Sequence, residues 1–413
     1  MKAINIKTEY LKNPIGIDIQ NPRIFWNCDS GIKQTAYRIV SEKWDSGKVE
    51  TDSMCAEYQP VTNTGERVTF RILLWDEKGN EGEWSKPAYF EMGILNKSEW
   101  TAKWITGNYT VNKKHRYPVD CFRKEFKTSG EIQSARLYIT ACGLYCAEIN
   151  GTKVSMPLAP GITDYNKRIQ YQTFDVTSLI KDTNVITAEL ADGWYRGSCG
   201  AWGRTNQYGT ETKLLAQLVV IYKDGRKETV CTDETWQWSN DGPIRFADNK
   251  DGEIVEAYRI PSYSGTAKVT FHNITPTASN NVPIAEKETF KGKMTVTPDG
   301  KKLIDFGQNM AGYIAFKIKA KAGQKLTLRF GEMLRDGELT LKNIQCSTKK
   351  KTTPLQKIEY TCREGLNEYK TKFAIFGFQY VEIDTDIDVS ADDFTAVSVY
   401  SDMEDTGFFD SSN

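Results

Sequence analysis

The stretch RVTFRILLWDEKGNEGEWSKP, residues 67–87, decides the fold class of this chain. It contains an apolar β-type run, Val68–Trp75, then a polar turn at Lys78-Gly79-Asn80, and it leads into a second run, Ala88–Met92. Further runs of this kind follow along the chain at Ala135–Thr140, Leu144–Ile149, Gln170–Val176, Val185–Leu190 and Leu214–Tyr222. Asn-Gly and Asp-Gly pairs, which readily adopt the positive φ of tight hairpins, follow several of these runs. Because sustained helical periodicity is nearly absent, the sequence predicts an all-β protein of tandem antiparallel β-sandwiches.

The chain of 413 residues is long enough for two to four domains, and it divides into three blocks. The first block, residues 1–95, resembles a fibronectin type III or Ig-like module, with a strand, a Gly turn, Trp-Ser-Lys-Pro and a last strand. A second block ends near residue 288, because residues 276–298 are polar and contain proline. The third block extends to residue 413.

Composition excludes several classes of function. The 54 Lys and Arg balance the 54 Asp and Glu, so a nucleic-acid partner is not expected. No apolar run approaches the ~20 residues of a membrane span. With only two histidines, His115 and His272, neither a Cys2His2 zinc site nor most His-based catalysis is available. The nine irregularly spaced cysteines and the polar N-terminus predict a cytoplasmic protein, or a periplasmic or secreted one if a leader peptide has been removed.

Two stretches of the second block contain the residue types that bind neutral sugars. One is LAPGITDYNKRIQY, residues 158–171, and the other is ADGWYRG, residues 191–197, which is followed by the loop SCGAWGRTNQYG. Carboxylate, amide and guanidinium groups can hydrogen-bond sugar hydroxyls, while an aromatic ring stacks on the apolar face of the pyranose. A carboxylate with an Asn and backbone carbonyls could instead hold calcium. The alternative is that both stretches are ordinary loops whose Trp and Tyr cover the core.

The tripeptide Asp305-Phe306-Gly307 occurs in protein kinases as a magnesium-binding motif. A kinase also needs an upstream His-Arg-Asp loop and a Gly-rich nucleotide loop, and this sequence contains neither. We therefore interpret the tripeptide as a turn at the end of a strand.

The same stretches, in this order, resemble the bacterial α-L-rhamnosidases of glycoside hydrolase family 78. The resemblance is carried by residues 8–39 in the first block, by LAPGITDYNKRIQYQTFDVT and ADGWYRG in the second, and by DFGQNMAGY, GEML, FAIFGFQYVEI and VYSDM in the third. It implies a jelly-roll, carbohydrate-binding-like domain at 119–288 and a second large β-sandwich at 289–413. It also implies that residues 96–118 pack with the third domain.

In that family an (α/α)6 barrel follows these domains and carries the general acid and general base for inverting hydrolysis of terminal α-L-rhamnosyl bonds. The resemblance therefore implies that the catalytic residues lie outside this chain, that the chain alone is inactive, and that its partners are the barrel and a rhamnose-containing glycan. In some members the jelly roll itself binds rhamnose with the help of calcium. The matching positions here are Asp164, Tyr165, Asn166, Arg168, Asp192, Trp194, Tyr195 and Asn206, with calcium near Asp164 and Asn166.

Three alternatives remain open on the sequence. The chain could be a free-standing lectin-like protein, a purely structural set of β-sandwiches, or an enzyme with a catalytic site inside these residues.

Overall fold

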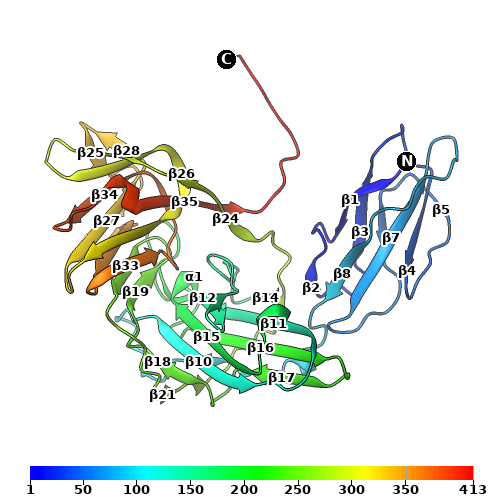
Figure 1. Cartoon of the computed structure of the whole chain (residues 1–413), viewed down its shortest axis with the longest axis horizontal. Coiled ribbons are helices and arrows are strands. Elements are labelled where there is room, and N and C mark those ends of the chain that lie inside the picture. Colours follow the sequence, from blue (N-terminus) through cyan, green and yellow to red (C-terminus); the bar gives the residue numbers. More distant parts are fainter. Residues whose placement is uncertain (349–350, 413) are drawn as a thin grey trace.

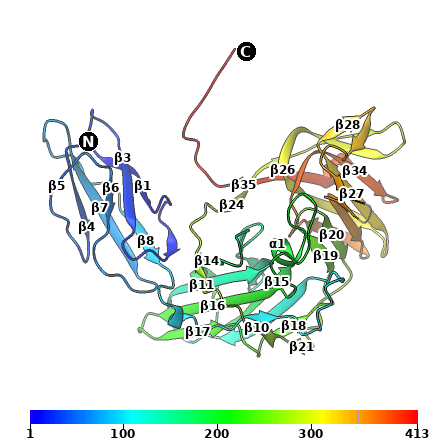
Figure 2. The same cartoon turned by 180° about the vertical axis from the view of Figure 1, so that it is seen from behind.

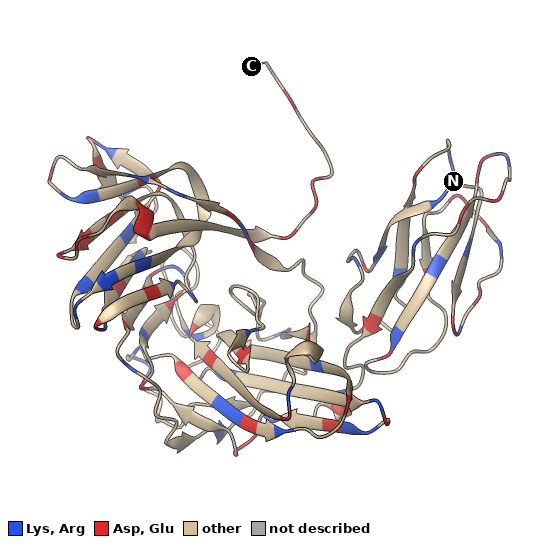
Figure 3. Cartoon of the chain, viewed as in Figure 1, with Lys and Arg blue, Asp and Glu red and all other residues tan. Residues whose placement is uncertain are grey.

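The computed structural model describes residues 1–348 and 351–412, and it arranges three β-domains in a wide U (Figure 1). The second domain forms the base of the U, and the first and third domains form its arms (Figures 1 and 2). Lysines, arginines and acidic residues are interspersed over all three domains (Figure 3). Within the described residues, no helix is long and apolar enough to cross a membrane. The predicted all-β class is confirmed.

The first domain is an Ig-like sandwich of two sheets. Its smaller sheet contains β1 (Ala3–Thr8), β3 (Arg23–Cys28) and β6 (Cys55–Glu57). Its larger sheet has the order β2 (Ile15–Ile17), β8 (Ala88–Met92), β7 (Arg67–Trp75), β4 (Ala36–Ser41) and β5 (Val49–Glu50). The alternating apolar residues of β7 fill the space between the sheets, where Phe70, Ile72 and Leu74 are fully buried.

The second domain is a larger sandwich. One sheet has the order β13 (Thr152–Lys153), β12 (Leu144–Ile149), β15 (Thr183–Ala191), β10 (Asp120–Lys127), β18 (Gln237–Ser239) and β21 (Gly265–Thr266). The other has β22 (Lys268–Val269), β9 (Ile105–Thr106), β16 (Lys213–Tyr222), β11 (Ile132–Cys142), β14 (Gln170–Asp175) and β23 (Thr277–Ala278), with β17 (Lys227–Cys231) beside β16. The short helices η1 (Lys97–Glu99), η2 (Thr177–Leu179) and α1 (Gly193–Arg196) lie in its connections.

The third domain is built on one large curled sheet. Its order is β19 (Ile244–Asp248), β20 (Gly252–Glu256), β32 (Lys357–Thr361), β27 (Lys325–Gly331), β34 (Phe376–Thr385), β26 (Lys302–Ala320), β35 (Phe394–Ser401) and β24 (Ile284–Phe290). Strands β25 (Lys293–Val296) and β33 (Gly365–Lys370) also pair with β26. Two hairpins, β28 (Met333–Arg335) with β29 (Glu338–Thr340) and β30 (Cys346–Ser347) with β31 (Thr352–Thr353), and the short helix η3 (Ala391–Asp393) complete it.

The sheets depart from the predicted organisation in three places. Strands β19 and β20 lie inside the predicted second domain, but β20 pairs with β32 and so joins the third sheet. Residues 96–118 were expected to pack with the third domain, and they do so at Arg116, which bonds Asp248 of β19, whereas Ile105 of the same segment pairs with Leu214 of the second domain. The turn predicted at Asp305 lies inside β26 rather than at its end. Each difference depends on pairing between distant segments, which local sequence pattern does not specify.

The first domain is attached to the second through a buried ion pair. Glu91 of β8 accepts two hydrogen bonds from Arg136 of β11, at 2.6 Å from Nε and 2.9 Å from Nη2. The Tyr171 hydroxyl accepts a hydrogen bond from the Ile94 N–H at 2.8 Å. Gly16 has a positive φ of 80°, and an added Cβ would lie 1.9 Å from Thr173 Oγ1. These contacts fix the two domains against each other at close range.

We predict that Glu91→Gln destabilises this junction by about 3 kcal/mol, because it removes the buried carboxylate that faces the Arg136 guanidinium and leaves the half-exposed Asp175 as its remaining ion-pair partner. Urea unfolding monitored by tryptophan fluorescence measures the change. The matched control is Lys223→Ala, which removes the exposed Lys223–Glu131 pair and should leave the unfolding curve unchanged. Equal effects of the two substitutions on the free energy of unfolding would contradict the claim that the Glu91–Arg136 pair stabilises the junction.

Candidate functional site

Three of the predicted sugar-binding residues, Asp164, Asn166 and Arg168, are exposed on one loop between β13 and β14. The Asp164 carboxylate accepts the backbone N–H of Asn166 at 3.2 Å, and its other oxygen lies 3.7 Å from Lys167 Nζ. The Thr163 hydroxyl donates to the Arg168 carbonyl at 2.7 Å and closes the loop. Their polar groups are therefore available to a ligand from solvent.

Tyr165 and Tyr195 lie in the core of the second domain. They are only 2% and 4% exposed. Their rings meet edge to face with centroids 5.2 Å apart, and Tyr208 meets Tyr165 in the same way at 5.1 Å. The Tyr165 hydroxyl donates to the Gly161 carbonyl at 3.0 Å. Neither ring presents a free face on which a sugar could stack.

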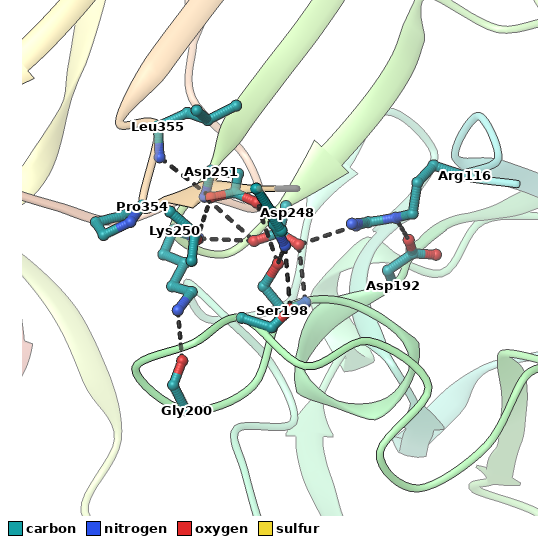
Figure 4. A network of polar contacts seen from close by, with 12 residues as sticks. Arg116, Asp192, Ser198, Gly200, Asp248, Lys250, Asp251, Pro354 and Leu355 are labelled. Atoms are coloured by element: carbon teal, nitrogen blue, oxygen red, sulfur yellow. Dashed lines mark hydrogen bonds and ion pairs between the residues drawn. The ribbon is translucent and has the colours of Figure 1, made fainter. Parts of the chain in front are cut away.

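Asp192 is buried at the start of α1, where it binds two arginines, of which Arg116 is drawn in Figure 4. One carboxylate oxygen accepts a hydrogen bond from Arg196 Nε at 2.6 Å, and the other accepts one from Arg116 Nε at 2.8 Å. Arg116 in turn donates from Nη2 to Asp248 at 2.9 Å. Asp192 therefore belongs to an ion-pair network that connects the segment before β10, helix α1 and strand β19.

The network continues into the third domain through Asp251 (Figure 4). Its Oδ1 accepts hydrogen bonds from the Thr353 hydroxyl at 2.6 Å and the Leu355 N–H at 3.1 Å. Its Oδ2 accepts one from the Ser198 hydroxyl at 3.1 Å and lies 3.5 Å from Lys351 Nζ. We call the residues Arg116, Asp192, Arg196, Ser198, Asp248, Asp251, Lys351 and Thr353 the junction network.

Trp194 also faces the third domain. Its ring packs against a core that combines residues of both domains, including Leu144, Ala191, Val255 and Phe330. Its Nε1 donates to the side-chain oxygen of Asn249 at 2.9 Å in the amide orientation in which the Asn249 nitrogen also donates to the Ser198 carbonyl. The Trp194 ring is thus part of the junction between the domains.

The electrostatics of the buried carboxylates match a structural role. Burial acts to raise the pKa of Asp248, but the charge and hydrogen bond of Arg116 outweigh it and hold that pKa below its usual range. Asp120 instead accepts a hydrogen bond from Trp238 Nε1 at 2.9 Å, and the charge of Arg196 lowers its pKa by less than burial raises it. Burial therefore raises the pKa of Asp120 to about 6. Asp248 stays ionised at neutral pH and balances Arg116.

The last candidate, Asn206, lies in the loop after α1 with a positive φ of 58°. Its Nδ2 donates to the Lys113 carbonyl at 3.3 Å. In the same loop Trp202 is 59% exposed, so this Trp presents the free aromatic surface that Trp194 does not. In the sequence, Gly200 and Gly203 flank Ala201 and Trp202, and glycines at this spacing indicate a surface loop. This pattern favours Trp202 over Trp194 as the exposed aromatic residue.

The loop around Asp164 does not fit a protein-built calcium site. Calcium takes six to eight oxygen ligands in proteins, whereas this loop supplies one carboxylate and the amide of Asn166. Across residues 1–348 and 351–412, no group of three or more His, Cys, Asp and Glu side chains is placed to hold a metal ion. A calcium ion at Asp164 would need most of its ligands from a bound sugar or from water.

Comparison with known families matches each of the three domains. Residues 3–96 match the Rha78A-like N-terminal immunoglobulin domain, residues 130–294 the α-L-rhamnosidase N-terminal domain, and residues 295–400 the bacterial α-L-rhamnosidase concanavalin-like domain. These matches define the chain as a series of β-domains of a glycosidase family. The chain belongs to the α-L-rhamnosidases, of which it comprises the N-terminal domains.

Individual relatives agree with this assignment. An α-L-rhamnosidase of Formosa agariphila is 32% identical over 98% of this chain and 48% of its own length. One of an Alteromonas species is 31% identical over 90% of this chain and 44% of its own length. The crystal structure of an α-L-rhamnosidase from Aspergillus terreus superposes with a TM-score of 0.90 and 29% identity, covering 100% of this chain and 50% of that one. The chain spans about half the length of the relatives it matches.

We predict that Asp192→Asn lowers the free energy of unfolding by about 3 kcal/mol, because it leaves the buried Arg196 and the partly buried Arg116 with less compensating charge. Asp164→Asn on the exposed loop is the matched control, and its effect should stay within ~0.5 kcal/mol. Urea unfolding of both variants makes the comparison. If Asp164→Asn lowered the free energy of unfolding more than Asp192→Asn, the exposed loop rather than Asp192 would stabilise the fold.

Proposed function

We propose that this chain forms the non-catalytic β-domains of an α-L-rhamnosidase that hydrolyses terminal α-L-rhamnosyl residues of glycosides. The observation that carries the proposal is the match of all three domains, in order, to domains of that family. The superposition of the whole chain on half of the Aspergillus terreus enzyme supports it.

In this proposal the chain contributes a rigid support, and the chemistry takes place on a catalytic (α/α)6 barrel. An inverting glycosidase needs one carboxylic acid to protonate the leaving oxygen and one carboxylate, ~6.5–9.5 Å away, to activate water. The buried carboxylates of this chain are engaged otherwise, since Asp192, Asp248 and Asp251 each bind cations or backbone groups of the junction network. We assign no catalytic residue within residues 1–413.

The first test is hydrolysis of an aryl α-L-rhamnoside by the purified chain. We expect no release of the aryl group above the uncatalysed rate, because the acid and base pair is supplied by the barrel. Turnover that copurifies with the chain and persists at constant specific activity would show that a catalytic site lies within these residues.

We further propose that the loop containing Asp164, Asn166 and Arg168 binds L-rhamnose of the substrate glycan, with calcium bridging the sugar and Asp164. Support comes from the exposure of these three polar side chains together on one loop. The buried positions of Tyr165, Asp192 and Tyr195, and the packing of the partly buried Trp194 on the core between the domains, favour a scaffold role for the rest of the predicted site.

Calorimetric titration of L-rhamnose into the chain, with calcium and again with EDTA, tests this binding. We expect a dissociation constant on the order of 1 mM with calcium, and at least tenfold weaker binding in EDTA and in Asp164→Ala. Asp224→Ala, which removes an exposed carboxylate from the turn between β16 and β17, is the control and should bind normally. Unchanged binding by Asp164→Ala would remove this loop from the proposal and leave the domain as scaffold.

A further inference from the structure

Strand β26 contains a bulge that exposes Gly307, Gln308 and Asn309. Its register with β34 runs from the Asp305–Tyr380 pair to the Met310–Phe378 pair, so four residues of β26 lie opposite the single Gln379. The bulge is braced from within, because Asp305 accepts hydrogen bonds from the Gly307 N–H at 2.7 Å and from Gln379 Nε2 at 2.9 Å. Phe306 anchors it by packing in the core. Braced bulges of this kind serve to aim side chains.

Beside the bulge lies a groove of about 390 Å³. It is formed by β26 together with β35 and the edge strand β24, which follow it in the sheet (Figure 1). Its lining residues are Glu288, Phe290, Gln308, Asn309, Met310, Ala311, Ser398 and Tyr400. The groove lies in the third domain and shares no residue with the loop around Asp164.

The carboxylate of Glu288 is held in place at one side of the groove. Its Oε1 accepts a hydrogen bond from the Tyr400 hydroxyl at 2.6 Å, and its Oε2 accepts one from the Ser398 hydroxyl. These two hydrogen bonds lower the pKa of Glu288, so it is an ionised acceptor at neutral pH. Each oxygen keeps a lone pair for a further donor.

The amides of Gln308 and Asn309 are ready to bind a ligand. Both side chains are exposed, and no hydrogen bond involves either amide within the part of the chain that the structure describes. Each amide offers two N–H donors and a carbonyl acceptor. The Tyr400 ring, which is 46% exposed and has Lys287 Nζ 5.6 Å from its centroid, adds an aromatic surface, and Phe290 and Met310 add apolar contacts.

We propose that this groove is a second carbohydrate site, which binds a neutral monosaccharide unit of a glycan. Paired hydroxyls of a sugar match the alternating donors and acceptors of two amides and a fixed carboxylate, and the apolar face of the ring matches Tyr400. No lining residue carries a positive charge, and Lys287, which lies over the Tyr400 ring, is paired with Asp402, so an anionic sugar would meet the carboxylate of Glu288 with little compensating charge. A single carboxylate is too few for a metal site.

The test is titration of L-rhamnose, D-galactose and D-glucose into the full chain, with D-glucuronate as the anionic comparison. We expect at least one neutral sugar to bind with a dissociation constant on the order of 1 mM, and D-glucuronate to bind at least tenfold more weakly. The double variant Gln308→Ala/Asn309→Ala should weaken binding of that sugar at least tenfold without a shift in Tm, because both side chains are exposed. Asn343→Ala removes an exposed amide elsewhere on the same domain and should leave it unchanged.

Chemical-shift changes of the Gln308 and Asn309 side-chain N–H groups on addition of the sugar locate the site independently of affinity. Sugar binding that survives the double variant but is lost in Asp164→Ala would overturn the groove and support the loop. Absence of binding by all three neutral sugars would also overturn it, while leaving the proposed α-L-rhamnosidase assignment, which rests on the family matches, untouched.

Discussion

The pairing of Arg116 with Asp192 and Asp248 is the interaction on which the arrangement of the second and third domains depends. The arginine lies between a helix of one domain and a strand of the other; both carboxylates are buried, and the Arg116 side chain is 26% exposed. Removing ionised groups from water is costly unless each has a partner. The three segments are therefore constrained to meet in one geometry, and the apolar core that surrounds them continues from one domain into the other.

This shared junction gives a physical reason why the chain forms a stable support. The first domain is attached by the same kind of device, a buried Glu91–Arg136 pair at the other end of the second domain. Each junction combines a buried ion pair with closely packed neighbours, so neither is free to act as a flexible linker.

The candidate site shows where sequence reasoning succeeds and where it stops. The residue types in LAPGITDYNKRIQY and ADGWYRG suit sugar binding, yet only Asp164, Asn166 and Arg168 of that group are exposed together. Asp192 and Trp194 have the same chemistry, but distant partners at Arg116 and Asn249 occupy them. In sequence an aromatic residue that stacks on a sugar looks the same as one that covers a core. The sequence does not reveal the groove beside Gln308, because its walls come from three strands, of which β24 and β35 are more than 100 residues apart.

By itself, the sequence determined the all-β class, the strands such as Val68–Trp75 and Leu214–Tyr222, and the family, because alternation of apolar residues and the order of local motifs are properties of short segments. Tertiary structure alone decided that β19 and β20 join the third sheet, that Asp192 is a structural ion-pair partner, and that a bulge in β26 opens a groove. The physical reason is that strand pairing and charge compensation are settled between distant segments. They depend on which partners are nearby after folding, and no local pattern records that information.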